Sequence, residues 1–164
     1  MSEENSIDVY SFEKENREYF ERNLPPRPAT YFDSEGFKEI TRELLREQEN
    51  HDVYMHLIRD AQGTMVGRIN LSVLEDDRKT AELGYRIGEN VTNLGYASEA
   101  VKLVLEKAFT TYGLHKIIAG TATYNLASQR VLLKNGFTFS KIIENDFQMN
   151  NEWINTAVFE IRNL

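Results

Sequence analysis

The chain has 164 residues, the length of about one domain, and its 41% hydrophobic and 27% charged residues are typical of a globular protein. It contains no cysteine, which excludes disulfides, cysteine-ligated zinc and a thiol nucleophile. Its net charge of -7 argues against nucleic acid as a direct partner, because neutralising phosphates requires a basic surface.

No apolar run approaches the roughly 18 residues that a membrane span needs, and the acidic start does not resemble a signal peptide. We therefore expect a cytoplasmic protein without a membrane partner. Most of the negative charge lies early, since residues 1–50 carry 13 acidic and 7 basic side chains, a net charge of -6. This segment is either a solvated surface of amphipathic helices or a surface that attracts cationic amines to a cleft.

Two helices are predicted in this acidic segment. Residues 11–22 place their aromatic side chains on one side of a helix, and three prolines between residues 25 and 28 end it because proline cannot continue a helix. The second helix begins at Ser34, as the N-cap, and runs to about Asn50 with one apolar stripe.

From residue 53 the hydrophobic pattern changes to a period of two. This predicts three strands, at 53–59, 64–74 and 80–88, joined by short polar turns as an antiparallel meander. In the third strand, alternate residues point to opposite faces. Leu83, Tyr85 and Ile87 share one face, and Glu82, Gly84 and Arg86 share the other.

A loop with a glycine, 91–100, follows and runs into a helix whose apolar stripe stops at Gly113. Backbone N–H groups in the loop and first helical turn lack partners within the helix, and the helix dipole adds partial positive charge. A phosphate can therefore bind there without any lysine, and Gly95 lets the main chain approach a bulky ligand closely.

The remaining pattern predicts a strand at 116–123, a helix at 128–135 and a hairpin of 137–143 with 153–162. The strands before and after the long helix should be parallel neighbours, because a helical crossover connects them. The predicted fold class is α/β with a mixed sheet.

The loop sequence Thr92-Asn93-Leu94-Gly95-Tyr96-Ala97, followed by Ser98, resembles the acyl-CoA pyrophosphate loop of the GCN5-related N-acetyltransferases (GNAT), written Q/R-x-x-G-x-G/A. A second run, from Asn125 through Ser128 to Lys134-Asn135-Gly136-Phe137, resembles the N-x-x-S…K-x-G-F pattern of the branch that acetylates ribosomal-protein N-termini. The likeness covers residues 50 to 164. It departs from the family at Thr92, where Gln or Arg is usual, and at Asn93, where a first glycine is common.

This resemblance implies one acetyltransferase domain over 1–164, with 1–50 as a helical acceptor-side segment and 51–164 as the core. The implied architecture is a mixed, mostly antiparallel sheet flanked by helices, with a splayed parallel strand pair at the acyl-CoA site. The implied substrate is acetyl-CoA, and no metal is implied. The residues it assigns to cofactor binding are Tyr85, Arg86, Ile87, Thr92, Asn93, Leu94, Gly95, Tyr96, Ala97, Ser98, Asn125 and Ser128, with the oxyanion donor among the strand N–H groups near Tyr85 to Ile87.

Acyl transfer from a thioester to an amine needs an uncharged nucleophile, donors for the developing oxyanion and a proton for the departing thiolate. The resemblance gives the proton-donor role to Ser128, one helical turn after Asn125. Both residues are also good helix caps, and the two roles are compatible. Tyr124 and Tyr96 are alternative acids.

The candidate general base is Glu82, in the strand that lines the cleft. The alternative is a surface glutamate paired with Arg68 or Lys79. Glu144 and Asp146 are secondary candidates for the base, and the three histidines lack metal-ligand spacing.

The sequence therefore predicts an acetyl-CoA-dependent N-acetyltransferase that transfers acetyl directly to a primary amine. The preferred acceptor is a protein N-terminal α-amine, as in ribosomal protein acetylation. One alternative acceptor is a small-molecule amine such as a polyamine, an aminoglycoside or an amino acid. Another alternative is a catalytically weak CoA-binding sensor, suggested by Thr92, Asn93 and the missing assured base. A homodimer is the assembly considered.

Overall fold

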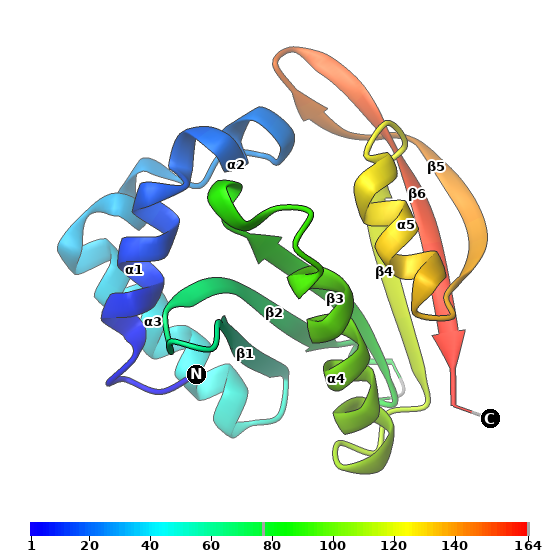
Figure 1. Ribbon diagram of the computed structural model, residues 1–164, viewed down its shortest axis with the longest axis horizontal. Helices are drawn as coiled ribbons and strands as arrows, with labels where there is room; N and C mark the ends of the chain where they lie inside the picture. Colours follow the sequence, from blue (N-terminus) through cyan, green and yellow to red (C-terminus); the bar gives the residue numbers. More distant parts are fainter. Residues whose placement is uncertain (77, 164) are drawn as a thin grey trace.

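The computed structural model describes residues 1–76 and 78–163, which form a mixed six-stranded sheet flanked by helices (Figure 1). The strands are β1 (Val53–Arg59), β2 (Met65–Val73), β3 (Thr80–Ile87), β4 (Lys116–Ala122), β5 (Thr138–Met149) and β6 (Glu152–Arg162). Their order across the sheet is β1-β2-β3-β4-β6-β5. Only β3 and β4 pair in parallel among these strands, and the other neighbours are antiparallel, which confirms the predicted fold class.

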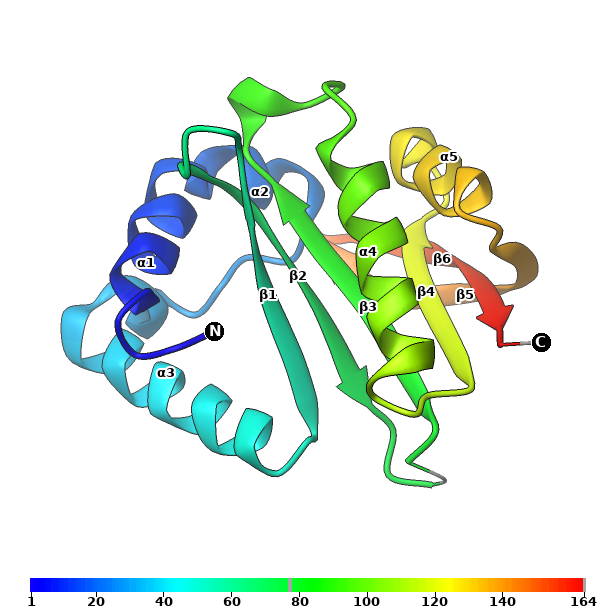
Figure 2. The same ribbon diagram turned by 60° about the horizontal axis from the view of Figure 1, so that its bottom comes forward.

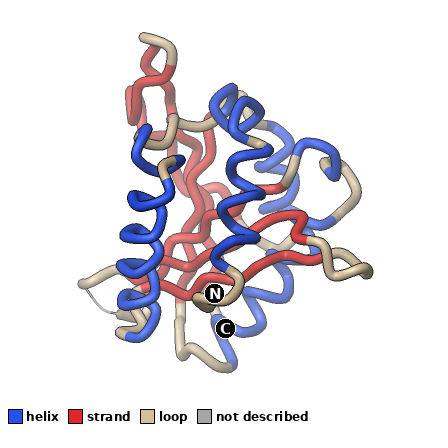
Figure 3. Tube along the Cα trace, turned by 90° about the vertical axis from the view of Figure 1, so that its left-hand side faces the viewer, coloured by secondary structure: helices blue, strands red, loops and turns tan. Residues whose placement is uncertain are grey.

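Helices cover both faces of the sheet (Figures 2 and 3). They are α1 (Ser6–Glu15), α2 (Arg17–Asn23), α3 (Ser34–Glu49), α4 (Tyr96–Thr110) and α5 (Leu126–Lys134), with 3-10 turns η1 (Ala29–Phe32) and η2 (Glu89–Val91). Side-chain alternation in β3 identifies the two faces, since Leu83 joins the core cluster under α4 while Arg86 contacts Glu13 of α1. No helix in the described part of the chain is long and apolar enough to cross a membrane.

The main core lies between the sheet and α4. Its fully buried side chains include Ile69, Leu71, Val101 and Ile117, from two strands and the helix. A smaller cluster of Val9, Tyr31 and Phe37 packs the N-terminal helices together. The apolar face of the sheet and the apolar stripe of α4 therefore form one layer, which holds α4 against the sheet.

The predicted helix at 11–22 is wrong, because the chain forms two helices that meet at Asn16. This residue leaves helical geometry, with φ -100° and ψ 10°. Its side-chain amide donates to the carbonyl oxygen of Phe12, and its side-chain oxygen accepts the Glu89 N–H, both at 2.9 Å. An asparagine side chain that competes for backbone partners disfavours a continuous helix, and here it also ties the helices to η2.

Further differences from the sequence prediction include the cap of α3, the start of α5 and the end of β5. Asp33, not Ser34, caps α3, because its carboxylate accepts the Gly36 N–H at 3.3 Å. Helix α5 begins at Leu126, two residues earlier than predicted. Strand β5 extends to Met149 past an irregularity between residues 143 and 147, where Asn145 has a φ of 50°. That bulge interrupts the two-residue alternation, so the pattern hid the second half of the strand.

Candidate active site

Strands β3 and β4 pair over only three residues and then separate. The paired positions are Thr80 with Lys116, Ala81 with Ile117 and Glu82 with Ile118. From Leu83 onward, the β4-facing edge of β3 has left this ladder, and its N–H groups are available in the gap. The splayed pair that the sequence predicts is confirmed. Both strands run into helices, so the starts of α4 and α5 lie at the open end of the gap (Figure 2).

The loop before α4 presents main chain rather than side chains. Gly95 has a φ of 91°, and a Cβ built on it would meet nothing within 4 Å, so the space beside it is open. The first backbone bond of the helix runs from the Glu99 N–H to the Gly95 carbonyl. The N–H groups of residues 96–98 precede that bond and can hold an anion at the positive end of the helix dipole.

Side chains of the same loop are used within the protein or lie in solvent. The Thr92 hydroxyl donates to the Glu89 carbonyl at 3.0 Å, and the Ser98 hydroxyl accepts from the Asn135 amide at 3.2 Å. Leu94 is 67% exposed. Asn93 has a φ of 61°, a left-handed geometry that asparagine tolerates better than most residues. The usual Gln or Arg at position 92 is thus replaced by a residue that shapes the loop.

Across the gap, the Tyr85 hydroxyl of β3 and the Ser128 hydroxyl of α5 lie 2.9 Å apart and share a hydrogen bond. The Ser128 N–H donates to the Asn125 side-chain oxygen at 3.1 Å, so Asn125 caps α5. The cap therefore uses the main chain of Ser128 and leaves its hydroxyl for Tyr85. Burial raises the pKa of the Tyr85 phenol, and the bond to Ser128 only partly opposes this, so Tyr85 keeps its proton at neutral pH.

Sequence reasoning assigned only main-chain and cofactor roles to the Tyr85 region and missed its hydroxyl. The sequence signal for this role was the hydroxyl of Tyr85, a polar group on a strand face that otherwise carries the apolar side chains of Leu83 and Ile87. The alternative acids are less well placed to donate in this gap. Tyr124 is 50% exposed, and Tyr96 packs against the main core.

Glu82 is exposed and occupies the last paired position of β3 with β4, on the strand face opposite Tyr85. Arg68 pairs with Glu13, so it is not the partner that the sequence alternative offered to Glu82. Glu144 and Asp146 lie in the irregular part of β5, at the sheet edge and three strands along from β3. Glu82 is thus the carboxylate nearest the start of the gap among these three candidates.

Helix α2 faces the tip of the β5–β6 hairpin (Figure 1). An open cleft of about 490 Å³ lies in this region. Its lining combines Glu21 and Pro26 with residues 148–151 of the hairpin. Beneath α1 and α2, the buried carboxylate of Glu13 contacts three arginines: Arg27, Arg68 and Arg86. The side of the sheet that carries Glu82 is therefore polar and charged.

Comparison with known proteins gives consistent matches. A family model described as the acetyltransferase (GNAT) domain matches residues 3–138. The probable N-acetyltransferase YjcK of Bacillus subtilis (strain 168) is 31% identical over 153 residues, which are 92% of this chain and 84% of that protein.

Solved structures share the fold. The ribosomal-protein-S5-alanine acetyltransferase of Vibrio fischeri superposes with a TM-score of 0.92 at 19% identity, covering 99% of this chain and 90% of that one. The spermidine N-acetyltransferase of Vibrio cholerae, in complex with CoA and spermine, has a TM-score of 0.82 at 18% identity and covers 99% and 92%. By its matched domain and its similarity to YjcK, the chain belongs to the GNAT family of N-acetyltransferases.

Proposed function

We propose that this protein transfers acetyl from acetyl-CoA directly to a primary amine, with a peptide N-terminal α-amine as the preferred acceptor. The observation that carries the proposal is the Tyr85–Ser128 hydrogen bond across the separated strands. It sets a protonated hydroxyl pair beside the gap where a thioester has free main-chain donors. The GNAT family membership supports the same reaction type.

The residues fit the cofactor that this reaction needs. The N–H groups of residues 96–98 and the open space at Gly95 suit a pyrophosphate, which carries the negative charge that a helix start favours. The gap between β3 and β4 suits the narrow pantetheine arm, which would extend toward Asn125 and Ser128. The spermidine acetyltransferase of V. cholerae, which shares this fold, has CoA in its complex.

In the proposed reaction a neutral amine attacks the thioester carbon, a C–N bond forms and the C–S bond breaks. The N–H groups near residues 85–87 stabilise the oxyanion. Ser128 donates a proton to the departing thiolate and recovers one from Tyr85, whose raised pKa keeps it protonated before the reaction. Tyr85 then takes a proton from water, which restores the pair for the next turnover. The proton that the amine loses goes to water or to Glu82, which is exposed on the acceptor side.

Acceptor chemistry favours an α-amine over a lysine side chain. Their ordinary pKa values are about 7.8 and 10.4, so at neutral pH the reactive neutral form is roughly 300-fold more abundant for the α-amine. This difference corresponds to roughly 3.5 kcal/mol in the free energy of deprotonating the acceptor. An enzyme without a buried base can therefore use an α-amine more readily than a lysine side chain. Polyamines are the alternative acceptors, and the arginines around Glu13 disfavour polycations on that side of the sheet.

A thiol-release assay tests the proposal. Acetyl-CoA is offered with short peptides bearing free N-termini, the same peptides N-acetylated but carrying an internal lysine, spermidine, an aminoglycoside and free amino acids. We expect turnover with free N-termini and much slower turnover with internal lysines. Comparable rates on internal lysines, or a clear preference for spermidine, would contradict the proposed acceptor. CoA binding without turnover on any amine would favour the sensor alternative.

A further inference from the structure

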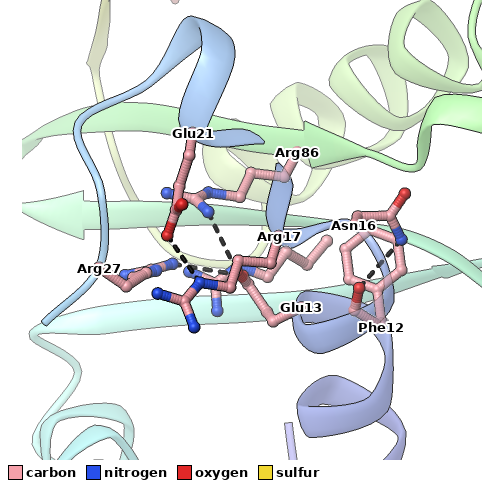
Figure 4. Close-up of polar contacts among 8 residues, drawn as sticks. Phe12, Glu13, Asn16, Arg17, Glu21, Arg27 and Arg86 are labelled. Carbon is pink, nitrogen blue, oxygen red and sulfur yellow. Dashed lines mark hydrogen bonds and ion pairs between the residues drawn. The ribbon is translucent and has the colours of Figure 1, made fainter. Parts of the chain in front are cut away.

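Glu13 of α1 forms a cationic cluster with Arg27, Arg68 and Arg86. Figure 4 shows Glu13 with Arg27 and Arg86. Glu13 is 1% exposed, and the three guanidinium groups lie 3.3, 3.1 and 3.0 Å from its carboxylate, in that order. One carboxylate thus faces three arginines, which leaves a net charge of +2 in a largely buried place. Glu13 is the buried acid of residues 1–50, all of which the structure describes.

Two hydrogen-bond donors of this cluster have no partner among residues 1–76 and 78–163: Arg68 Nη1 and Arg27 Nε, both buried. Arg68 is only 8% exposed as a whole. Burying a charged donor without a partner is costly, and a second buried anion would compensate both the charge and the missing bonds. Burial lowers the pKa of Arg86 to about 10, so this guanidinium remains charged at neutral pH.

A shallow hollow borders the cluster on the side of α1 and α2. Its lining includes Glu13, Arg17, Arg27 and Arg86, and it shares Glu21 with the cleft of about 490 Å³ at the tip of the β5–β6 hairpin. Arg86 directly follows Tyr85 in β3 and points to the opposite face. The strand therefore carries its phenol toward the gap that suits the thioester and its guanidinium toward the acceptor.

We propose that the arginines around Glu13 form a subsite for a carboxylate of the acceptor, so that the preferred substrates are peptides with Asp or Glu close to the reacting N-terminus. This proposal rests on the proposed acetyl transfer to an α-amine. A guanidinium group binds a carboxylate with two parallel hydrogen bonds, which gives both affinity and orientation.

The length of the Arg86 side chain sets which acceptor residue would reach the subsite. In the proposed site the thioester lies beside residues 85–87, so the guanidinium of Arg86 is separated from it by an extended arginine side chain, roughly 7 Å. An extended peptide advances about 3.3–3.6 Å per residue. With its α-amine at the thioester, a peptide would place the side chain of its second or third residue at the arginines.

The test compares two matched peptides that differ only by Glu or Gln at the second residue. For the unmodified protein we expect kcat/KM to be about 10-fold or more higher with Glu, the range of a charge-assisted hydrogen bond. Arg27→Gln should bring kcat/KM for the Glu peptide to within about 2-fold of the value for the Gln peptide. The matched control is Arg42→Gln, an exposed arginine of α3 that should keep the preference.

A second measurement uses succinate, a dicarboxylate that has no amine and cannot accept acetyl. At ten times its Kd, succinate should raise the thermal midpoint by about 3–5 °C beyond sodium chloride of equal ionic strength, but not in Arg27→Gln. Equal turnover of both peptides without a succinate effect would overturn the subsite and leave the acetyl transfer standing. Succinate binding without acetylation of any peptide would overturn the acceptor role, because the proposed function itself would have failed.

Discussion

Replacing Ser128 by alanine tests the proton-donor pair most directly. The hydroxyl lost in this variant bonds to Tyr85 at 2.9 Å, whereas the helix cap is retained because Asn125 binds the main-chain N–H of residue 128. A positioned general acid contributes about 10²- to 10⁴-fold, but a thiolate with a pKa near 8.5 leaves with little help. We therefore expect kcat to fall about 10- to 100-fold, which is about 1.4–2.7 kcal/mol of transition-state stabilisation.

The same geometry predicts the effects of the neighbouring variants. Tyr85→Phe keeps the ring and removes only the hydroxyl, so it should lower kcat by a similar factor if Ser128 draws its proton from Tyr85. The double variant should then be no slower than the slower single variant, because the two groups act as one unit. Asn125→Ala should instead cost about 1 kcal/mol of stability through the lost cap.

Steady-state kinetics and thermal unfolding on the same preparations separate these roles. The KM for acetyl-CoA should change little in Ser128→Ala, because only an interaction of the transition state is lost. Ser128→Ala should also be less stable by about 1–3 kcal/mol, since the buried Tyr85 hydroxyl loses its partner. A Ser128→Ala protein that is destabilised but fully active would refute the reasoning and leave the proton to Tyr85 or water.

The proposed site leads to further predictions for the cofactor loop, for Glu82 and for the pH dependence. Gly95→Val should abolish acetyl-CoA binding, because valine is strained at a φ of 91° and fills the open space. Thr92→Ala should change the affinity for acetyl-CoA little. Equal affinities of the two variants in a calorimetric titration would contradict the loop assignment. Glu82→Gln should lower kcat/KM for a peptide less than about 3-fold if water takes the amine proton. A loss of about 100-fold or more at saturating acetyl-CoA would instead establish Glu82 as a general base. The kcat/KM for a peptide should rise with pH up to about 7.8, as the peptide amine loses a proton. It should then stay level until about pH 10, because the pKa of Tyr85 is raised above its ordinary value. A decrease in kcat/KM that begins near pH 8 would exclude Tyr85 as the proton source.

The parts of the fold with strong periodicity could be predicted from the sequence. Strand β1 begins and ends where the alternation does, and the apolar stripe of α4 follows the loop that fits a phosphate. The missed features depend on single side chains that compete with the backbone. Asn16 divides the first helix by bonding to Phe12 and Glu89, and Asn145 allows a bulge that hides half of β5. Period-based reasoning has no signal for either event.

Sequence could place Ser128 and the loop because each forms a local motif, but it could not place their partners. Tyr85 and Ser128 are 43 residues apart, and Glu13 and Arg86 are 73 residues apart. Such pairings depend on how β3 separates from β4 and on how α1 lies on the sheet. No local pattern predicts either arrangement, and the charge count of residues 1–50 gave no sign that the buried acid Glu13 packs against Arg68 and Arg86 of the sheet.

In the proposed site, one short segment of β3 serves both substrates. Its alternation sends Tyr85 toward the gap that suits the thioester and Arg86 toward the opposite face. The N–H groups on its β4-facing edge are released beyond Glu82, because the pairing with β4 stops there. A strand paired along its whole length would have the same side-chain alternation but no free donors, and a loop would have the donors without a fixed side-chain direction. The early separation of two parallel strands is therefore the feature that turns an ordinary sheet position into a site for joining a thioester and an amine.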